Sequence, residues 1–115
     1  MADNRVFIGD DEGNFYCLKK CNGKILWKQH TGSRIIGAAA VEGKRVVVGS
    51  TDGAIYCFDT RSGELIWKRQ TAAAVMGCPV IENGIVYIGG SDGCFRALQL
   101  SDGSDKWCFD QVKGY

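Results

Sequence analysis

An internal repeat with a period of about 40 residues constrains this chain more than any other feature of its sequence. Its three tryptophans, Trp27, Trp67 and Trp107, are evenly spaced at this period. Residues 5–44 and 45–84 align without a gap and are identical at 12 of 40 positions. A repeat of this length indicates a series of similar supersecondary units that stack on one another, rather than one irregular domain.

Glycines follow the same period. The chain has 16 glycines and only 1 proline among 115 residues. Glycine accepts the positive φ that tight turns require, so the pattern predicts short elements joined by tight turns. The repeated glycines are Gly9, Gly49 and Gly89, Gly13, Gly53 and Gly93, and Gly23, Gly63 and Gly103.

Each repeat has the sequence pattern of strands rather than helices. In the middle repeat, Arg45–Gly49 and Ala54–Asp59 are rich in β-branched and aromatic residues, which favour strands. Gly37–Val41 before them and Leu65–Arg69 after them complete a set of four. No segment sustains the i, i+3, i+4 apolar spacing of a helix. Four antiparallel strands in each repeat form one blade of a β-propeller, so the predicted fold is all-β, a partial β-propeller.

The length of the chain limits the number of blades. We expect a three-stranded blade over residues 5–30 and four-stranded blades over 36–70 and 76–110, within a single partial propeller spanning 1–115. Closed propellers usually have roughly four to eight blades, so one chain does not close a ring. Three explanations stay open: a segment of a longer propeller, copies that associate (for example two chains giving six blades), or a stable open arc.

The segment that precedes each tryptophan resembles the tryptophan-docking motif of PQQ-like repeats, the quinoprotein dehydrogenase type of propeller. The family pattern is Ala-x-Asp-x-x-Thr-Gly-x-x-x-Trp. Its glycine and tryptophan occur in all three repeats, whereas Asp59 is the only match to the aspartate and Ala97 the only match to the alanine. The resemblance covers residues 5–111 and implies a propeller fold.

The residues of this motif have a physical role that does not depend on the family. Glycine accepts the left-handed backbone conformation of a hairpin turn. A tryptophan on the outer strand offers a large flat face to the next blade and an indole N–H to a backbone carbonyl. We therefore predict a structural role for the repeated motif residues, which are Gly13, Gly53, Gly93, Gly23, Gly63, Gly103, Trp27, Trp67 and Trp107.

The resemblance also implies features of PQQ-binding members that can be checked in the sequence. These are an adjacent pair of disulfide-bonded cysteines, a tryptophan floor, and an Asp-Glu-Asn set for Ca²⁺ and base catalysis. No two of the six cysteines are adjacent here. The acidic turns at 10–13, 51–53 and 91–93 are too short to supply the six to eight oxygens that Ca²⁺ prefers. We predict no catalytic, cofactor-binding or metal-binding residue, no PQQ or Ca²⁺, and no enzymatic activity for this chain.

The cysteines predict packing rather than chemistry. Cys17 and Cys57 occupy the repeat position that holds Ala97, which favours small buried thiols. Cys78 is expected in an inner strand. His30 is the only histidine, too few to complete a zinc site with these cysteines. We predict mostly free thiols.

Charge and hydropathy exclude other classes of function. The chain has 14 Lys and Arg against 13 Asp and Glu, and its basic residues are scattered, which argues against nucleic-acid binding. It lacks the run of about 18 apolar residues of a membrane span, and its polar N-terminus lacks a signal-peptide pattern. The resemblance implies a periplasmic or secreted location.

These observations predict a non-catalytic scaffold or protein-binding module. Its partner would be another protein or a second copy, bound through exposed blade faces. One alternative is a fragment of a PQQ-dependent dehydrogenase whose active-site residues lie outside this segment. A second alternative is a ligand-sensing propeller.

Overall fold

A computed structural model describes residues 4–35, 37–71, 75, 78–90 and 94–110. These residues form eleven strands in three antiparallel sheets and contain no helix. It follows that no helix in this part of the chain is available to cross a membrane. The predicted all-β fold, a partial β-propeller, is confirmed.

The three sheets follow one another along the chain, and in each the strands pair in chain order. The strands of the first sheet are β1 (Arg5–Gly9), β2 (Asn14–Lys19) and β3 (Ile25–His30). Those of the second are β4 (Ala40–Glu42), β5 (Arg45–Gly49), β6 (Ala54–Asp59) and β7 (Leu65–Gln70). Those of the third are β8 (Val80–Glu82), β9 (Ile85–Gly89), β10 (Cys94–Gln99) and β11 (Asp105–Asp110).

The innermost strands are shorter than the sequence predicts. β4 begins at Ala40 rather than Gly37 and pairs only with residues 45–47 of β5. β8 has the same length and joins β9 through Asn83 and Gly84, which both have positive φ, as a two-residue hairpin turn requires. Cys78 lies before β8 rather than within an inner strand, so its predicted position is wrong.

The outer hairpin of each sheet has a β-bulge at the same repeat position. The register shifts directly after Cys17, Cys57 and Ala97. Each of these residues is paired with the tryptophan of its own sheet on the neighbouring strand. The period of the repeat therefore extends from the sequence into the backbone geometry around the tryptophans.

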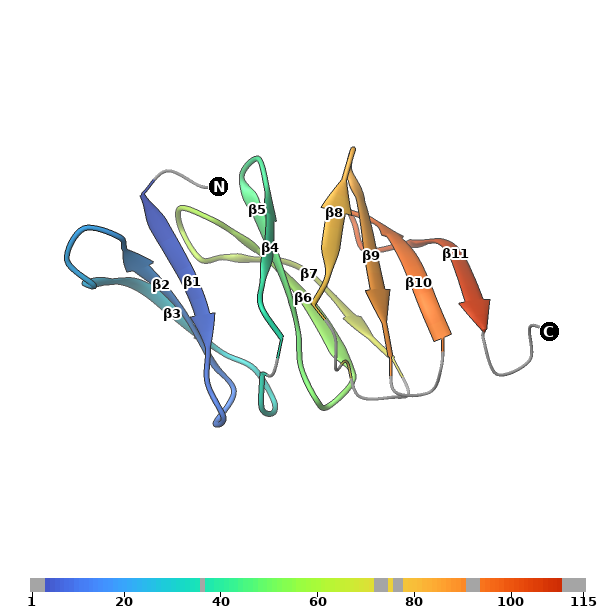
Figure 1. Cartoon of the computed structure of the whole chain (residues 1–115), viewed down its shortest axis with the longest axis horizontal. Helices are drawn as coiled ribbons and strands as arrows, with labels where there is room; N and C mark the ends of the chain where they lie inside the picture. The colour runs from blue at the N-terminus through green and yellow to red at the C-terminus, as the bar shows by residue number, and fades with distance from the viewer. Residues whose placement is uncertain (1–3, 36, 72–74, 76–77, 91–93, 111–115) are drawn as a thin grey trace.

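The sheets lie side by side, with the second between the first and the third (Figure 1). Alternate residues of β5 face its two neighbours: Val46 and Val48 belong to the core with the first sheet, and Val47 to the core with the third. All three valines are fully buried. Because only the middle sheet has a neighbour on both faces, the first and third sheets each present one face without a covering sheet among the described residues.

Candidate functional site

Two tryptophans join neighbouring sheets through their indole N–H groups. Trp27 in β3 donates to the carbonyl of Thr60 at 3.0 Å, and Trp67 in β7 donates to the carbonyl of Leu100 at 2.7 Å. Thr60 and Leu100 directly follow the third strand of the next sheet. Both indoles are buried, and each hydrogen bond satisfies a donor that would otherwise lose its contact with water.

Each of these indole rings lies on a glycine of the next sheet. A Cβ built at Gly63 would come within 2.5 Å of the Trp27 ring, and one built at Gly103 within 2.5 Å of the Trp67 ring. Both glycines also have a φ of +77°, a conformation that other residues adopt with strain. Space and backbone conformation therefore both require glycine at the turn that receives a tryptophan.

An aromatic layer on the first sheet supports Trp27. Phe7, Phe15 and Trp27 lie with their ring centroids 5.8–6.2 Å apart. Phe58 from the second sheet covers this layer, with its centroid 5.6 Å from that of Phe15 and 5.9 Å from that of Trp27. Such tilted and offset contacts stabilise the junction beyond the effect of apolar burial alone.

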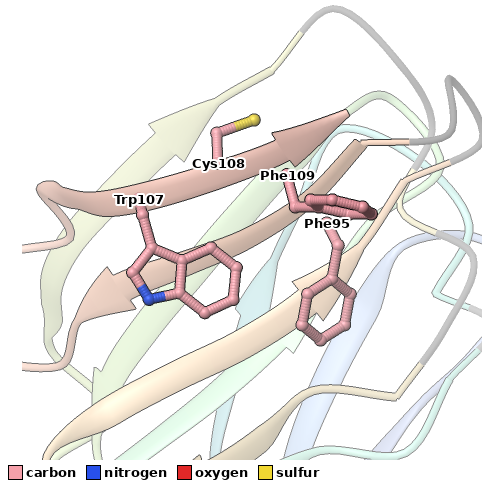
Figure 2. Close-up of a pocket in the computed structure, with 4 residues that line it drawn as sticks. All are labelled: Phe95, Trp107, Cys108 and Phe109. Carbon is pink, nitrogen blue, oxygen red and sulfur yellow. The ribbon is translucent and has the colours of Figure 1, made fainter. Parts of the chain in front are cut away.

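The third sheet has the same layer, and none of the described residues covers it. Tyr87, Phe95 and Trp107 occupy the equivalent repeat positions, with centroids 6.1–6.5 Å apart. Trp107 is 44% exposed, against 9% for Trp27. Figure 2 shows Trp107 and Phe109 on one side of β11 with Phe95 close to them, while Cys108 points to the other side. We call Tyr87, Phe95, Trp107 and Phe109 the aromatic end face. Its last three members, together with Cys108, line a hollow of about 420 Å³.

The first sheet exposes the kind of surface on which the second and third sheets receive the tryptophan of the preceding sheet. Val6 is 43% exposed and Ile8 51% exposed, whereas Val46 and Val48 at the equivalent positions of the second sheet are fully buried. Gly23 is exposed, and a Cβ built on it meets no atom within 4 Å. We call this surface the receiving end face; it is formed by Val6, Ile8, Leu18, Gly23 and Ile25.

Carboxylates in the turns bond to the backbone of their own turn. Asp10 accepts hydrogen bonds from the backbone N–H of Glu12 and Asn14, and the bond from Asn14 is the main reason that its pKa lies below the ordinary value. Asp59 accepts from Ser62 and Arg61, and these bonds lower its pKa likewise. These aspartates act as turn caps.

No group of three or more His, Cys, Asp or Glu side chains suited to holding a metal ion occurs among the described residues. The acidic turn at 10–13 illustrates the reason, because the Oδ1 and Oδ2 atoms of Asp10 already accept hydrogen bonds within the first hairpin. The acidic turn at 91–93 lies outside the described residues.

None of the six cysteines is joined to another in a disulfide. Cys17 and Cys57 are buried between sheets, and this burial raises the pKa of the Cys57 thiol to about 12 and raises that of Cys17 as well. A thiol with a raised pKa is a poor nucleophile at neutral pH. His30 lies at the end of β3, where its Nδ1 is 3.1 Å from the Oδ1 of Asn14.

The glycines in the turns between β1 and β2 and between β5 and β6 have a second structural role. Gly13 and Gly53 have φ of +88° and +92°. The carbonyl of each accepts a bond from the backbone N–H and another from the side-chain hydroxyl of a threonine after the last strand, Thr31 and Thr71 respectively. These bonds attach the residue that follows the last strand of the first and second sheets to a turn of the same sheet. Gly93, predicted to be the third member, lies outside the described residues.

Polar contacts between sheets were not predicted from the sequence. Gln29 donates from Nε2 to the carbonyl of Gly63 at 2.6 Å. At the next junction, Arg69 Nη2 lies 2.6 Å from Asp105 Oδ2. Gln29 and Arg69 are one period apart in the sequence, so the repeat indicated a shared position. The chemistry of the pair differs between the two junctions, and identity-based comparison of the repeats therefore missed it.

Comparison with known families decides what kind of repeat this is. A profile of PQQ-like repeats, described as outer membrane protein assembly factor BamB, matches residues 1–107. The chain belongs to this PQQ-like repeat family. The predicted resemblance to PQQ-like repeats is thereby confirmed. No curated protein sequence matches the chain significantly.

Several solved structures share the fold of this chain. BamB from Moraxella catarrhalis is 18% identical, with a TM-score of 0.86. Quinohemoprotein alcohol dehydrogenase ADHIIG from Pseudomonas putida HK5 is 22% identical, with a TM-score of 0.84. A computationally designed protein, Ika8, is 20% identical, with a TM-score of 0.86.

The extent of these matches limits what they imply. The alignments cover 96%, 95% and 96% of this chain, but only 33% of BamB, 19% of the dehydrogenase and 35% of Ika8. The chain thus spans about a third or less of these structures. They include an assembly factor and an enzyme, and fold alone does not decide between such functions.

Proposed function

We propose that this chain is a non-catalytic segment of PQQ-like propeller that acts as a scaffold and binds protein. One observation carries this proposal: both ends of the stack expose apolar surface that the middle of the stack buries. Phe95, Trp107 and Phe109 are 36–49% exposed on the aromatic end face. Contiguous apolar surface of this kind marks protein interaction sites in folded proteins.

The side chains that the family could use for cofactor chemistry serve the fold in this segment. Trp27 and Trp67 are docked on the next sheet. Asp10, Asp59 and Asp102 bond to their own turns. The sequence has no adjacent cysteine pair. These residues do not fit a PQQ and Ca²⁺ site, which supports a scaffold rather than a catalytic role.

A dehydrogenase segment is the second candidate. The observation that favours it is the structural similarity to quinohemoprotein alcohol dehydrogenase, which extends over 95% of this chain. Under this alternative the cofactor-binding residues belong to other parts of a longer enzyme. The two candidates differ in whether a protein that contains this segment retains PQQ.

Equilibrium dialysis against PQQ in the presence of Ca²⁺ tests the proposal. We expect the 115-residue chain to leave PQQ evenly distributed across the membrane, as measured by quinone absorbance. A natural chain that contains these residues within a larger propeller should give the same result if the protein is a scaffold. Stoichiometric retention of PQQ by such a chain, with dye-linked oxidation of an alcohol, would favour the dehydrogenase instead.

A further inference from the structure

We propose that the two end faces bind each other between copies of this chain. The aromatic end face of one copy packs on the receiving end face of a second copy, with Trp107 lying over Gly23 and its indole N–H donating to the carbonyl of Lys20. This inference rests on the proposed role as a protein-binding scaffold, and it identifies the partner as a second copy.

The first argument is the match between one exposed tryptophan and one uncovered glycine. Within the chain, Trp27 lies over Gly63 and Trp67 over Gly103. Of the three glycines at this repeat position, only Gly23 has no indole over it, and of the three tryptophans only Trp107 is exposed.

The acceptor for the indole N–H follows from the same repeat. The carbonyls that accept from Trp27 and Trp67 belong to Thr60 and Leu100. Lys20 holds the equivalent position on the first sheet, one period before Thr60, and is exposed. Because the contact uses the backbone carbonyl, it does not require the side chain of a threonine or leucine, and the long lysine stem can keep its ammonium group in water.

The second argument is the apolar cover that the aromatic layer needs. On the first sheet, Phe7, Phe15 and Trp27 are covered by Phe58. The receiving end face offers Leu18 at the position of Phe58, and the exposed Val6 and Ile8 at the positions of the buried Val46 and Val48. This surface therefore has the same chemical character as the one that covers the aromatic layer inside the chain.

The third argument comes from the position where Arg69 meets Asp105 between the second and third sheets. Phe109 is equivalent to Arg69, and Ile25 is equivalent to Asp105. Phe109 is 49% exposed and Ile25 is 54% exposed. The repeat position that holds an ion pair between the second and third sheets thus holds two apolar residues at the two ends of the chain. Neither side would bury an unpaired charge at this position in the proposed contact.

A contact of this kind joins more than one copy. A contact between opposite ends of identical chains is heterologous, and repetition closes it into a ring or extends it into a filament. Each copy contributes three sheets. Closed propellers usually contain roughly four to eight blades, so one copy does not close a ring. The expected assembly therefore contains two or more copies joined head to tail by identical junctions.

Sedimentation velocity of the chain from low to high micromolar concentration tests this assembly. We expect a species of at least twice the chain mass of 12.5 kDa. Trp107→Ala should weaken association at least about 30-fold, as loss of a central interface tryptophan does. Ile66→Ala is the control, because it also truncates an exposed apolar side chain. Ile66 lies in β7 of the middle sheet and belongs to neither end face. This substitution should leave the mass unchanged.

A second pair of variants tests the other side of the contact. Gly23→Ala would place a methyl group where the indole must lie, and we expect it to abolish association. Gly43→Ala is its control, because Gly43 is also exposed, has a φ of +61° and has no atom within 4 Å of its Cβ position. This control should associate like the unmodified chain. Far-ultraviolet circular dichroism establishes that each variant is folded.

Mixing the two disruptive variants distinguishes this geometry from a symmetric contact. A Trp107→Ala copy retains Gly23, and a Gly23→Ala copy retains Trp107, so an equal mixture has one intact junction and should form a species of twice the chain mass. A folded chain that stays monomeric at every concentration, or a mixture that stays monomeric, would overturn the proposal. So would association that is unaffected by Trp107→Ala. PQQ retention is read independently of mass, so failure of this assembly leaves the test of the scaffold role intact.

Discussion

Trp27 and Trp107 occupy the same position of the repeated motif, but Trp27 is buried between two sheets and Trp107 is exposed at the end of the stack. Each lies on an outer strand, four residues after a turn glycine, and each contacts two aromatic rings of its own sheet. Trp27 is 9% exposed and Trp107 is 44% exposed. The motif therefore positions the ring on its own sheet, and the next sheet alone determines whether the ring is buried.

This difference affects where the stability of the molecule lies. In stacked repeats, stability is approximately the sum of the intrinsic stability of each unit and the contacts between neighbours. The described residues contain two such junctions, each formed by an indole, its glycine and an apolar core. Variants of equivalent residues at the junctions and at the ends measure the contribution of the neighbouring sheet directly.

The largest effect is expected for Trp67→Ala. This change removes a buried ring and its hydrogen bond to Leu100, and we expect the free energy of unfolding to fall by about 3–5 kcal/mol. Trp107→Ala removes an exposed ring, and the fall should be below about 1 kcal/mol. Urea denaturation followed by circular dichroism measures both, at a dilution where the mass is that of one copy. Equal losses would show that the next sheet does not determine the contribution of the ring.

The turn glycines should give an intermediate effect. Gly63→Ala combines an unfavourable φ of +77° with a methyl group 2.5 Å from the ring of Trp27. In dilute solution, Gly23→Ala has only the backbone penalty, because its φ is +74° and its Cβ position is free of contacts. We expect a loss of about 1–2 kcal/mol for Gly23→Ala and about 1–3 kcal/mol more for Gly63→Ala. The same urea midpoints provide the measurement, and similar losses at both glycines would contradict the role of the indole.

The repeat predicted the central strands of the fold well. β5 and β6 have the predicted bounds, because dense β-branched and aromatic residues end at glycine turns on both sides. The innermost strand was less predictable: the apolar pattern begins at Gly37, yet pairing begins at Ala40. Its length depends on how far β4 stays beside β5 beyond the turn, which apolar character does not specify.

For the candidate site, sequence identity found the tryptophans and glycines and missed the surfaces around them. Tyr87 and Phe95 replace Phe7 and Phe15 of the first sheet, so a search for identical residues passes over a layer that similar ring shapes maintain. The exposure of Trp107 is a property of the stack rather than of the motif. It required coordinates, because the local sequence around Trp27 and Trp107 has the same docking pattern.

A smaller effect should appear at alkaline pH through Cys57, which is buried at a junction. Its pKa rises from an ordinary value of 9.0 to about 12 on folding because burial disfavours the thiolate. Above pH 9 the unfolded chain loses this proton while the folded chain retains it, so stability should fall as the pH rises toward 12. Cys57→Ala, which introduces the residue that the third sheet buries at Ala97, should reduce the slope of urea midpoint against pH. An unchanged slope would show that Cys57 titrates in the same way in both states.

The smallest effect is expected at the ion pair between Arg69 and Asp105. Both side chains are partly exposed, at 34% and 47%, so solvent screens their attraction. A double-mutant cycle with Arg69→Ala and Asp105→Ala should give a coupling of about 0.2–1 kcal/mol that decreases with added salt. At the neighbouring junction Gln29 donates to the Gly63 carbonyl, so the effect of Gln29→Ala should be nearly independent of salt. A salt-independent coupling at Arg69 would mean that the guanidinium contributes through packing, and that the two junctions are held in the same way despite their different charges.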